Sequence, residues 1–292
     1  MISQNSLGVW QSTDAMTSAE AGDFARRVEG WGYGVLWIPE ARGRNALVHS
    51  AWLLAATTKL IVATGIANIY GRDAQAMASA AAGLNEQSGG RFLLGLGVSH
   101  APLVKGLRGH NYGKPVATMQ AYLSAMAHAS YGAPAPAEKP RVVLAALGPR
   151  MLELAGAETD GAHPYLVPPE HTARARAILG RGKWLCPEHK LLLETDPAKA
   201  RAVARQALGF YFQLENYRNN LLRLGFSEAE LTNGGADRLI DALVAWGDEK
   251  TIRTRIRAHW DAGADHVCLQ ALSSGRPGPD ENLLARLAPA TW

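Results

Sequence analysis

The chain has 292 residues, of which 47% are hydrophobic and 19% are charged, and its formal net charge at pH 7 is +4. This composition excludes an intrinsically disordered chain, because disorder requires few apolar residues and a high density of charge. Cys186 and Cys268 lack zinc-binding spacing and allow at most one disulfide, which fits a reducing compartment. We therefore expect a cytoplasmic protein with a large hydrophobic core.

Neither a membrane nor a nucleic acid is an expected partner. The first ten residues lack the basic start and apolar core of a signal peptide, and polar residues interrupt the longest apolar tract, near 46–69. The densest basic run, 171–183, has no interleaved aromatic residues, so we expect a solvated helix there.

Eight short apolar runs follow one another along the chain and predict β-strands. They are 7–10, 34–40, 59–68, 91–99, 141–147, 161–168, 183–194 and 266–272. Several are almost continuously apolar, as parallel strands buried on both faces should be.

Helices are predicted between these runs. Thr17 and Glu20 form a capping box, and Phe24, Val28 and Trp31 then follow at helical spacing until Gly32. Further helices are predicted after Asp196-Pro197, over 208–225, over 247–263 and after Pro279-Asp280.

This alternation predicts an α/β fold, a (β/α)₈ TIM barrel, for which about 250 residues are typical. The extra length lies between the seventh and eighth strands, at about 195–246, where the pattern is helical. Because no linker-like tract isolates it, we interpret 1–292 as one domain with a helical insertion.

The segment 91–103, RFLLGLGVSHAPL, has three interpretations. Gly95 and Gly97 begin a dinucleotide-binding fingerprint, but His100 occupies its third glycine position. Gly97-Val98-Ser99 begins the nucleophile elbow of a serine hydrolase, but the final glycine is missing, and the following glycines and prolines predict a loop rather than a helix. The remaining interpretation is a buried strand that ends in a functional loop.

The carboxyl ends of barrel strands carry function, and these ends are poor in metal ligands. Only Glu40 and His100 qualify, so no metal site is predicted. Small apolar, glycine and amide groups at these ends favour a flat organic cofactor.

Three segments carry a family resemblance: 64–74 (TGIANIYGRDA), 88–104 (SGGRFLLGLGVSHAPLV) and 247–270 (GDEKTIRTRIRAHWDAGADHVCLQ). They resemble the luciferase-like oxidoreductases, specifically the actinobacterial branch that uses the deazaflavin coenzyme F420. The resemblance implies a luciferase-like barrel with the deazaflavin across the strand ends and its tail phosphate toward the fifth and sixth strands.

The resemblance also implies cofactor-binding residues. The bond Gly65-Ile66 matches a non-prolyl cis peptide behind the ring, with an ordinary trans bond as the alternative. Asn68 is a ring-edge hydrogen-bond partner or a turn residue, and Trp37 and Ser99 are expected to touch the cofactor.

The tail phosphate is expected at the start of a helix. Gly148, Pro149 and Arg150 open it, and its free amides would meet the phosphate. The alternative is an ordinary turn from strand to helix with proline in the first turn.

His100 and Glu40 are the predicted catalytic residues. Relatives that act on sugar phosphates have a histidine at the Glu40 position and a carboxylic acid at the His100 position, so that substrate class is not expected. We expect His100 to move a proton while a hydride passes between the deazaflavin and an organic substrate, with Glu40 as orienter or second acid-base group. A purely structural histidine is the alternative.

Three other expectations complete the prediction. The alternative functions are an FMN-dependent monooxygenase and a non-catalytic flavin- or deazaflavin-binding protein. The alanine-rich helices at 45–57 and 73–89 correspond to the region through which related enzymes pair, so a homodimer is expected. Additional residues that could line the substrate cavity are His110, Tyr112, Tyr165 and His171.

Overall fold

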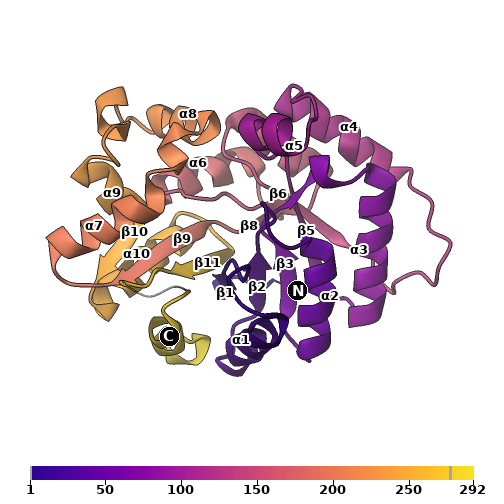
Figure 1. Cartoon of the computed structure of the whole chain (residues 1–292), viewed down its shortest axis with the longest axis horizontal. Helices are drawn as coiled ribbons and strands as arrows, with labels where there is room; N and C mark the ends of the chain where they lie inside the picture. Colours follow the sequence, from indigo (N-terminus) through magenta and orange to yellow (C-terminus); the bar gives the residue numbers. More distant parts are fainter. Residues whose placement is uncertain (1, 276–277) are drawn as a thin grey trace.

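A parallel β-sheet forms the centre of the molecule in a computed structural model that describes residues 2–275 and 278–292 (Figure 1). The strands are β1 (Ser6–Trp10), β2 (Val35–Ile38), β3 (Ile61–Thr64), β4 (Ala67–Asn68), β5 (Phe92–Gly97), β6 (Arg141–Leu144), β7 (Gly161–Ala162), β8 (Trp184–Leu185), β9 (Glu188–Leu193), β10 (Val244–Gly247) and β11 (His266–Ala271). Their order is β10-β9-β11-β1-β2-β3-β5-β6-β7-β8, and β4 pairs with β5.

The sheet closes into a TIM barrel through one continuous segment. β8 pairs with β7, β9 pairs with β11, and only Cys186 and Pro187 separate β8 from β9. Proline has no backbone N–H to donate to a neighbouring strand, which accounts for the break between β8 and β9. The Cys186 amide still donates to the Ala162 carbonyl at 2.9 Å, and the Cys268 amide donates to that of Pro187 at 2.9 Å. All eight predicted strands are confirmed, although β7 is much shorter than the strand predicted over 161–168.

Helices cover the outside of the barrel (Figure 1). They are α1 (Ser18–Gly30), α2 (Ala46–Ala56), α3 (Ala74–Ser88), α4 (Pro115–Ala127), α5 (Pro149–Glu158), α6 (Pro169–Leu179), α7 (Pro197–Leu208), α8 (Glu215–Arg223), α9 (Asp237–Leu243), α10 (Glu249–Asp261) and α11 (Glu281–Arg286). The capping box of Thr17 and Glu20 is present, and the side chains of Asp196 and Asp280 cap α7 and α11, as predicted.

The insertion at 195–246 differs from its prediction in two respects. The helix predicted over 208–225 is broken, because Leu214 has extended backbone angles (φ −90°, ψ 123°) before α8. In an unbroken helix Phe212 and Leu214 would point to nearly opposite sides, whereas the break lets both enter one buried cluster. The end of the insertion is also a strand, β10, which pairs with β9.

The prediction of a loop without a helix after Ser99 is wrong. Residues 101–107 are helical and include a π-helical turn, Leu103–Leu107. Pro102 is compatible with this start, because the first amides of a helix have no partner within it.

Two apolar clusters hold in place the strands and helices that surround the functional site. Trp37, Leu93, Val143 and Cys268 belong to a cluster from several strands of the barrel. A separate cluster joins α7, α8 and α9 to β10 and so anchors the insertion to the barrel. No helix in the described ranges is long and apolar enough to cross a membrane.

Candidate active site

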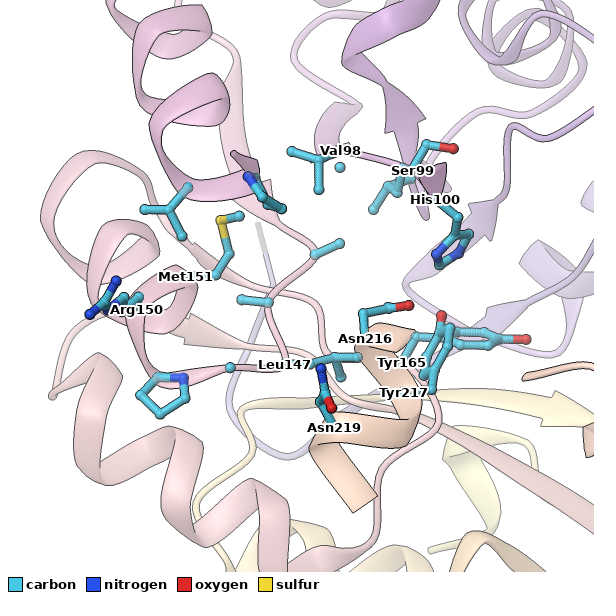
Figure 2. Close-up of a pocket in the computed structure, with 18 of the residues that line it drawn as sticks. Val98, Ser99, His100, Leu147, Arg150, Met151, Tyr165, Asn216, Tyr217 and Asn219 are labelled. Carbon is cyan, nitrogen blue, oxygen red and sulfur yellow. The ribbon is translucent and has the colours of Figure 1, made fainter. Parts of the chain in front are cut away.

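A cavity of about 710 Å³ lies at the carboxyl ends of β5, β6 and β7 (Figure 2). This size falls within the range of roughly 300–1,000 Å³ that is usual for cofactor and small-molecule sites. A larger cavity, of about 1240 Å³, reaches the amino ends of β6 and β7, where barrel enzymes do not place their chemistry. The smaller cavity is therefore the candidate site.

The end of β3 passes very close to β5 at the floor of this cavity. The peptide bond Gly65-Ile66 is cis, in agreement with the expectation from the resemblance. A Cβ atom on Gly95 would lie 1.9 Å from the Thr64 carbonyl oxygen, and one on Gly97 would lie 2.5 Å from the Ile66 side chain. These two glycines therefore permit close contact between strands, which explains them without a dinucleotide fingerprint.

His100 stands at one end of the cavity, in the turn that follows β5. Ser99 has a left-handed backbone (φ 56°), and this turn accompanies the change of direction before the following helix. The imidazole lies 5.7 Å from the ring of Tyr217, at 43°. Burial lowers the pKa of His100, and the nearby Asn216 side chain offsets part of that effect, so the ring is neutral near pH 7.

The opposite part of the cavity has the character of an anion site. Gly148 precedes α5, and no side chain caps the amides of its first turn. Arg150 lines the cavity, and the guanidinium of Arg223 would lie 3.5 Å from a Cβ atom on Gly148. In the described part of the chain neither arginine forms an ion pair with a carboxylate. An uncapped helix start with two free cations is suited to a phosphate.

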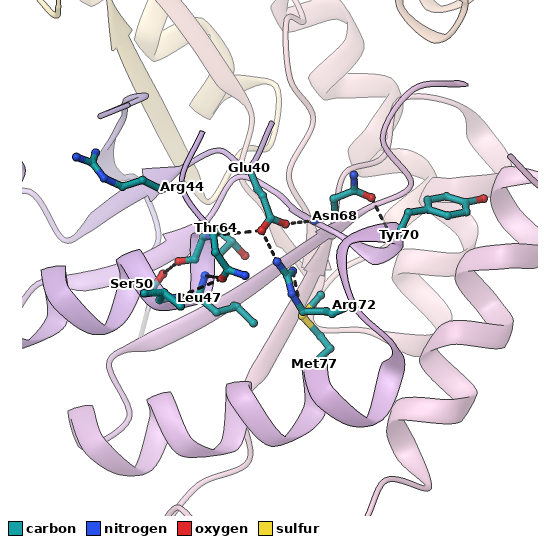
Figure 3. Close-up of polar contacts among 12 residues, drawn as sticks. Glu40, Arg44, Leu47, Ser50, Thr64, Asn68, Tyr70, Arg72 and Met77 are labelled. Carbon is teal, nitrogen blue, oxygen red and sulfur yellow. Dashed lines mark hydrogen bonds and ion pairs between the residues drawn. The ribbon is translucent and has the colours of Figure 1, made fainter. Parts of the chain in front are cut away.

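Glu40 lies beside the cavity, and its carboxylate is bound by a neighbouring arginine and two backbone amides (Figure 3). Its carboxylate pairs with Arg72 and accepts hydrogen bonds from the amides of Ala46 (3.2 Å) and Asn68 (2.8 Å). Its side chain is only 5% exposed. The Asn68 amide oxygen in turn accepts from the Tyr70 amide at 2.9 Å, in the predicted turn role. Neither Glu40 nor Asn68 is among the residues that line the cavity.

Trp37 and Gly65 lie next to His163 and are not among the residues that line the cavity. Trp37 is fully buried and stacks on the His163 ring at 4.3 Å and 13°. A Cβ atom on Gly65 would lie 2.8 Å from the Trp10 indole nitrogen and 3.1 Å from His163 Nε2, so glycine is required there. His163 lines the cavity, and burial lowers its pKa to about 4. Sequence reasoning did not identify this histidine.

Ser99 lines the cavity without the partners of a hydrolase nucleophile. Its left-handed backbone and the helix that follows are features of a nucleophile elbow. However, within residues 2–275 and 278–292 no hydrogen bond joins its hydroxyl to a histidine, and only its carbonyl is bonded, to the Tyr112 hydroxyl at 3.2 Å.

The cavity is thus lined by some, but not all, of the site residues predicted from the sequence. Its lining includes Ile66, Ser99, His100, Gly148, Pro149 and Arg150, and also Tyr112 and Tyr165. His110 and His171 are not in the lining, and His171 is buried with its Nε2 2.9 Å from the Leu147 carbonyl.

Sequence reasoning missed the contribution of the insertion. One face of α8 contributes Asn216, Asn219 and Arg223, and Tyr217 lies beside it (Figure 2). The polar residues recur at i, i+3 and i+7, which is the spacing of one helical face. That spacing was readable in the sequence, but it could not reveal that the face covers a cavity.

Comparisons with known proteins agree with this architecture. The model of a family described as luciferase-like monooxygenase matches residues 1–266. A Mycobacterium tuberculosis protein named as a coenzyme F420-dependent oxidoreductase is 25% identical, with 92% of this chain and 94% of the relative covered. A 5,10-methylenetetrahydromethanopterin reductase of Methanolobus tindarius is 27% identical over 64% of this chain and 65% of its own.

Solved structures share the fold at low sequence identity. An F420-dependent secondary alcohol dehydrogenase, in complex with an F420-acetone adduct, has a TM-score of 0.79 at 15% identity, with both chains covered completely. The oxygenating constituent of 3,6-diketocamphane monooxygenase from Pseudomonas putida, in complex with FMN, has a TM-score of 0.69 at 13% identity, covering 98% of this chain and 97% of that one.

Proposed function

Because the chain belongs to the luciferase-like monooxygenase family, we propose that it is an F420-dependent oxidoreductase that moves a hydride between this deazaflavin and a small organic substrate. Its homologues are enzymes, and so the non-catalytic alternative is set aside. The observation that carries the proposal is one cavity with a phosphate-type site at one end and a neutral histidine at the other.

The residues present fit such a cofactor. Arg150, Arg223 and the uncapped amides of α5 suit the tail phosphate, and the floor at Ile66 offers an apolar surface to a ring system. Bound F420 supplies the hydride exchange. The protein supplies binding, orientation and the site of proton transfer.

His100 carries the proton in this proposal. When an alcohol is oxidised, its hydroxyl proton passes to the bare nitrogen of the neutral imidazole as the carbon loses its hydride, and the product is a carbonyl compound. In the reverse direction the imidazolium returns that proton to the oxygen. Neutral His100 is therefore the form that starts the oxidation.

Glu40 has a supporting role in this proposal. Its pairing with Arg72 and its bond to the Asn68 amide favour a carboxylate that fixes the turn after β3. A direct exchange of protons with substrate would require it to leave these partners, which is unfavourable for a buried charge.

FMN is the alternative cofactor, and the FMN complex of the Pseudomonas putida relative supports it. Both cofactors carry a tricyclic ring and a tail phosphate, so the cavity features above suit either. An FMN-dependent monooxygenase would need reduced flavin from a partner reductase.

We also infer a homodimer and a cytoplasmic location. Val48 and Trp52 lie one turn apart on α2 and are 72% and 49% exposed, which supports an apolar contact for a second copy. Cys186 and Cys268 are free and buried, which supports a reducing compartment.

Paired titrations of the purified protein with oxidised F420 and with FMN test the function. We expect micromolar binding of F420, weaker binding of FMN, and quenching of tryptophan or cofactor fluorescence on binding. Tighter binding of FMN than of F420 would indicate a flavin-dependent monooxygenase. If the protein binds neither cofactor, both cofactor assignments are contradicted. Labelling of Ser99 by a fluorophosphonate probe would support the hydrolase interpretation instead.

A further inference from the structure

His171 holds the chain directly before the proposed phosphate site. It lies in the first turn of α6, it is buried, and it does not line the cavity. Its Nε2 is 2.9 Å from the Leu147 carbonyl oxygen. Because a carbonyl oxygen can only accept, Nε2 carries the ring proton and donates it. Burial lowers the pKa of His171 to about 4, so the ring keeps this neutral form near pH 7.

This hydrogen bond fixes the orientation of the peptide between Leu147 and Gly148. Among the described residues, the Leu147 carbonyl has His171 as its one hydrogen-bond partner. A trans peptide is planar and directs its C=O and its N–H to opposite sides, so the Gly148 N–H is directed away from His171. That N–H has no partner within residues 2–275 and 278–292, and Gly148 lines the cavity.

The same helix also holds the other side of the phosphate site. Arg174, one turn after His171 on α6, donates from Nη1 to the Arg223 carbonyl at 2.6 Å. This carbonyl lies in the last turn of α8, where helix carbonyls have no partner within the helix and a cation is favourable. Since the Arg223 guanidinium lies close to Gly148, α6 contacts the backbone on both sides of the site.

We propose that His171 is a positioning residue for the phosphate site, which fixes the Leu147-Gly148 peptide so that the Gly148 N–H faces the cavity as a donor to an anion. This inference rests on the proposed function, which places a cofactor phosphate at this point. Without the Nε2 donor the Leu147 carbonyl would turn toward water, and the Gly148 N–H would turn with it, because one rigid plane holds both groups. The loss is then confined to ligands that carry a phosphate.

Isothermal titration with two pairs of ligands tests the proposal. The members of each pair differ in the phosphate: F420 and a dephosphorylated deazaflavin, and FMN and riboflavin. We expect His171→Leu to weaken binding of the phosphate-bearing member by about three- to tenfold, the range for one neutral hydrogen bond, and to leave the affinity for its phosphate-free counterpart unchanged. His171→Gln, whose amide N–H can take the place of Nε2–H, should restore most of the affinity.

Thr172→Val is the matched control on the same helix. Thr172 is the next residue of α6, it is equally buried, and its hydroxyl lies 2.8 Å from His259 Nδ1 rather than at the Leu147 carbonyl. This variant loses one buried hydrogen bond and should keep the affinities of the unsubstituted protein. Thermal unfolding checks each fold, and if His171→Leu does not fold, His171→Asn, whose amide is too short to reach the carbonyl, replaces it.

Inorganic phosphate gives a test that needs no cofactor. The backbone amide signal that is absent from the NMR spectrum of a Gly148→Ala variant identifies Gly148. Added phosphate should shift this signal in the unsubstituted protein and in Thr172→Val, and much less in His171→Leu.

Equal weakening of both members of a pair by His171→Leu would overturn the proposal. So would an equal effect of Thr172→Val, or a Gly148 signal that responds to phosphate equally in His171→Leu. If F420 does not bind but FMN or inorganic phosphate shows the His171 effect, the proposed function falls and the role of His171 stands. If F420 binds tightly and His171→Leu changes nothing, the proposed function stands and the role of His171 falls. If no phosphate-bearing ligand binds, both are overturned.

Discussion

His100 is the residue on which the proposed chemistry depends. Burial lowers its pKa below the ordinary value near 6.5, so the ring is neutral and able to accept a proton throughout the neutral range. Tyr217 packs 5.7 Å from it, while the other predicted acid-base residue, Glu40, is held by Arg72. A neutral base in the cavity suits a reaction that moves one proton with one hydride.

Replacing His100 with Gln should lower turnover by about 10²- to 10⁴-fold, the usual contribution of general acid-base catalysis, while F420 affinity stays nearly the same. In the unsubstituted protein, the rate of substrate oxidation should fall as the pH drops through the lowered pKa of His100 and stay level above it. Steady-state kinetics over a pH series, together with cofactor titrations, measure both effects. Unchanged turnover in the variant would remove His100 from the mechanism.

At the scale of elements, α5 and α8 together form the part of the cavity that is proposed to bind the phosphate. The start of α5 offers backbone amides, and α8 extends along the cavity so that Arg223 reaches the same point while Tyr217 packs against His100. Seven residues of α-helix span about 10 Å, so this one helix contacts both ends of a ligand of that length.

Arg223→Gln should weaken F420 binding by about ten- to hundredfold, the range for a hydrogen bond to a charged group. A dephosphorylated deazaflavin should bind the unsubstituted protein and the Arg223→Gln variant with equal affinity, because it lacks the phosphate that Arg223 is proposed to contact. Arg218→Gln is the control on the same helix, since Arg218 pairs with Glu228 and does not line the cavity. Isothermal titration measures the affinities, and equal weakening for the dephosphorylated ligand would contradict a phosphate contact.

At the scale of the whole molecule, buried histidines link stability to pH. His49, His163, His171, His189, His259 and His266 are all buried. Burial is the main cause of the low pKa of each, about 4 for His49, His163 and His171 and about 3 for His259 and His266. The unfolded chain, with ordinary values near 6.5, binds protons that the folded chain does not.

Stability should therefore be fully present above about pH 6.5 and should fall as the pH drops from there toward about 4, by up to about 1.4 kcal/mol per pH unit for each such histidine. Chemical unfolding at a series of pH values measures the slope. A His259→Asn variant, if folded, should have a shallower slope than the unsubstituted protein. A level profile between pH 7 and 5 would show that these histidines do not control acid stability.

Size-exclusion chromatography with light scattering should give twice the chain mass of 31.3 kDa. If α2 carries the contact, replacing exposed Trp52 with Glu should favour the monomer, because a buried unpaired charge is unfavourable in an apolar interface. The corresponding substitution at exposed Leu107, outside α2, serves as the control. A monomer mass for the unsubstituted protein would reject the dimer.

The sequence by itself determined the barrel, because alternating apolar runs and capped helices are local patterns that each strand and helix carries in its own residues. It also pointed to His100 and to Gly148, Pro149 and Arg150, since residues at strand ends meet at one edge of a parallel barrel. Only the tertiary structure decided that Glu40 pairs with Arg72, that Gly95 and Gly97 accommodate the end of β3, and that α8 covers the cavity. These are contacts between residues far apart in the chain, and no local pattern encodes the partner.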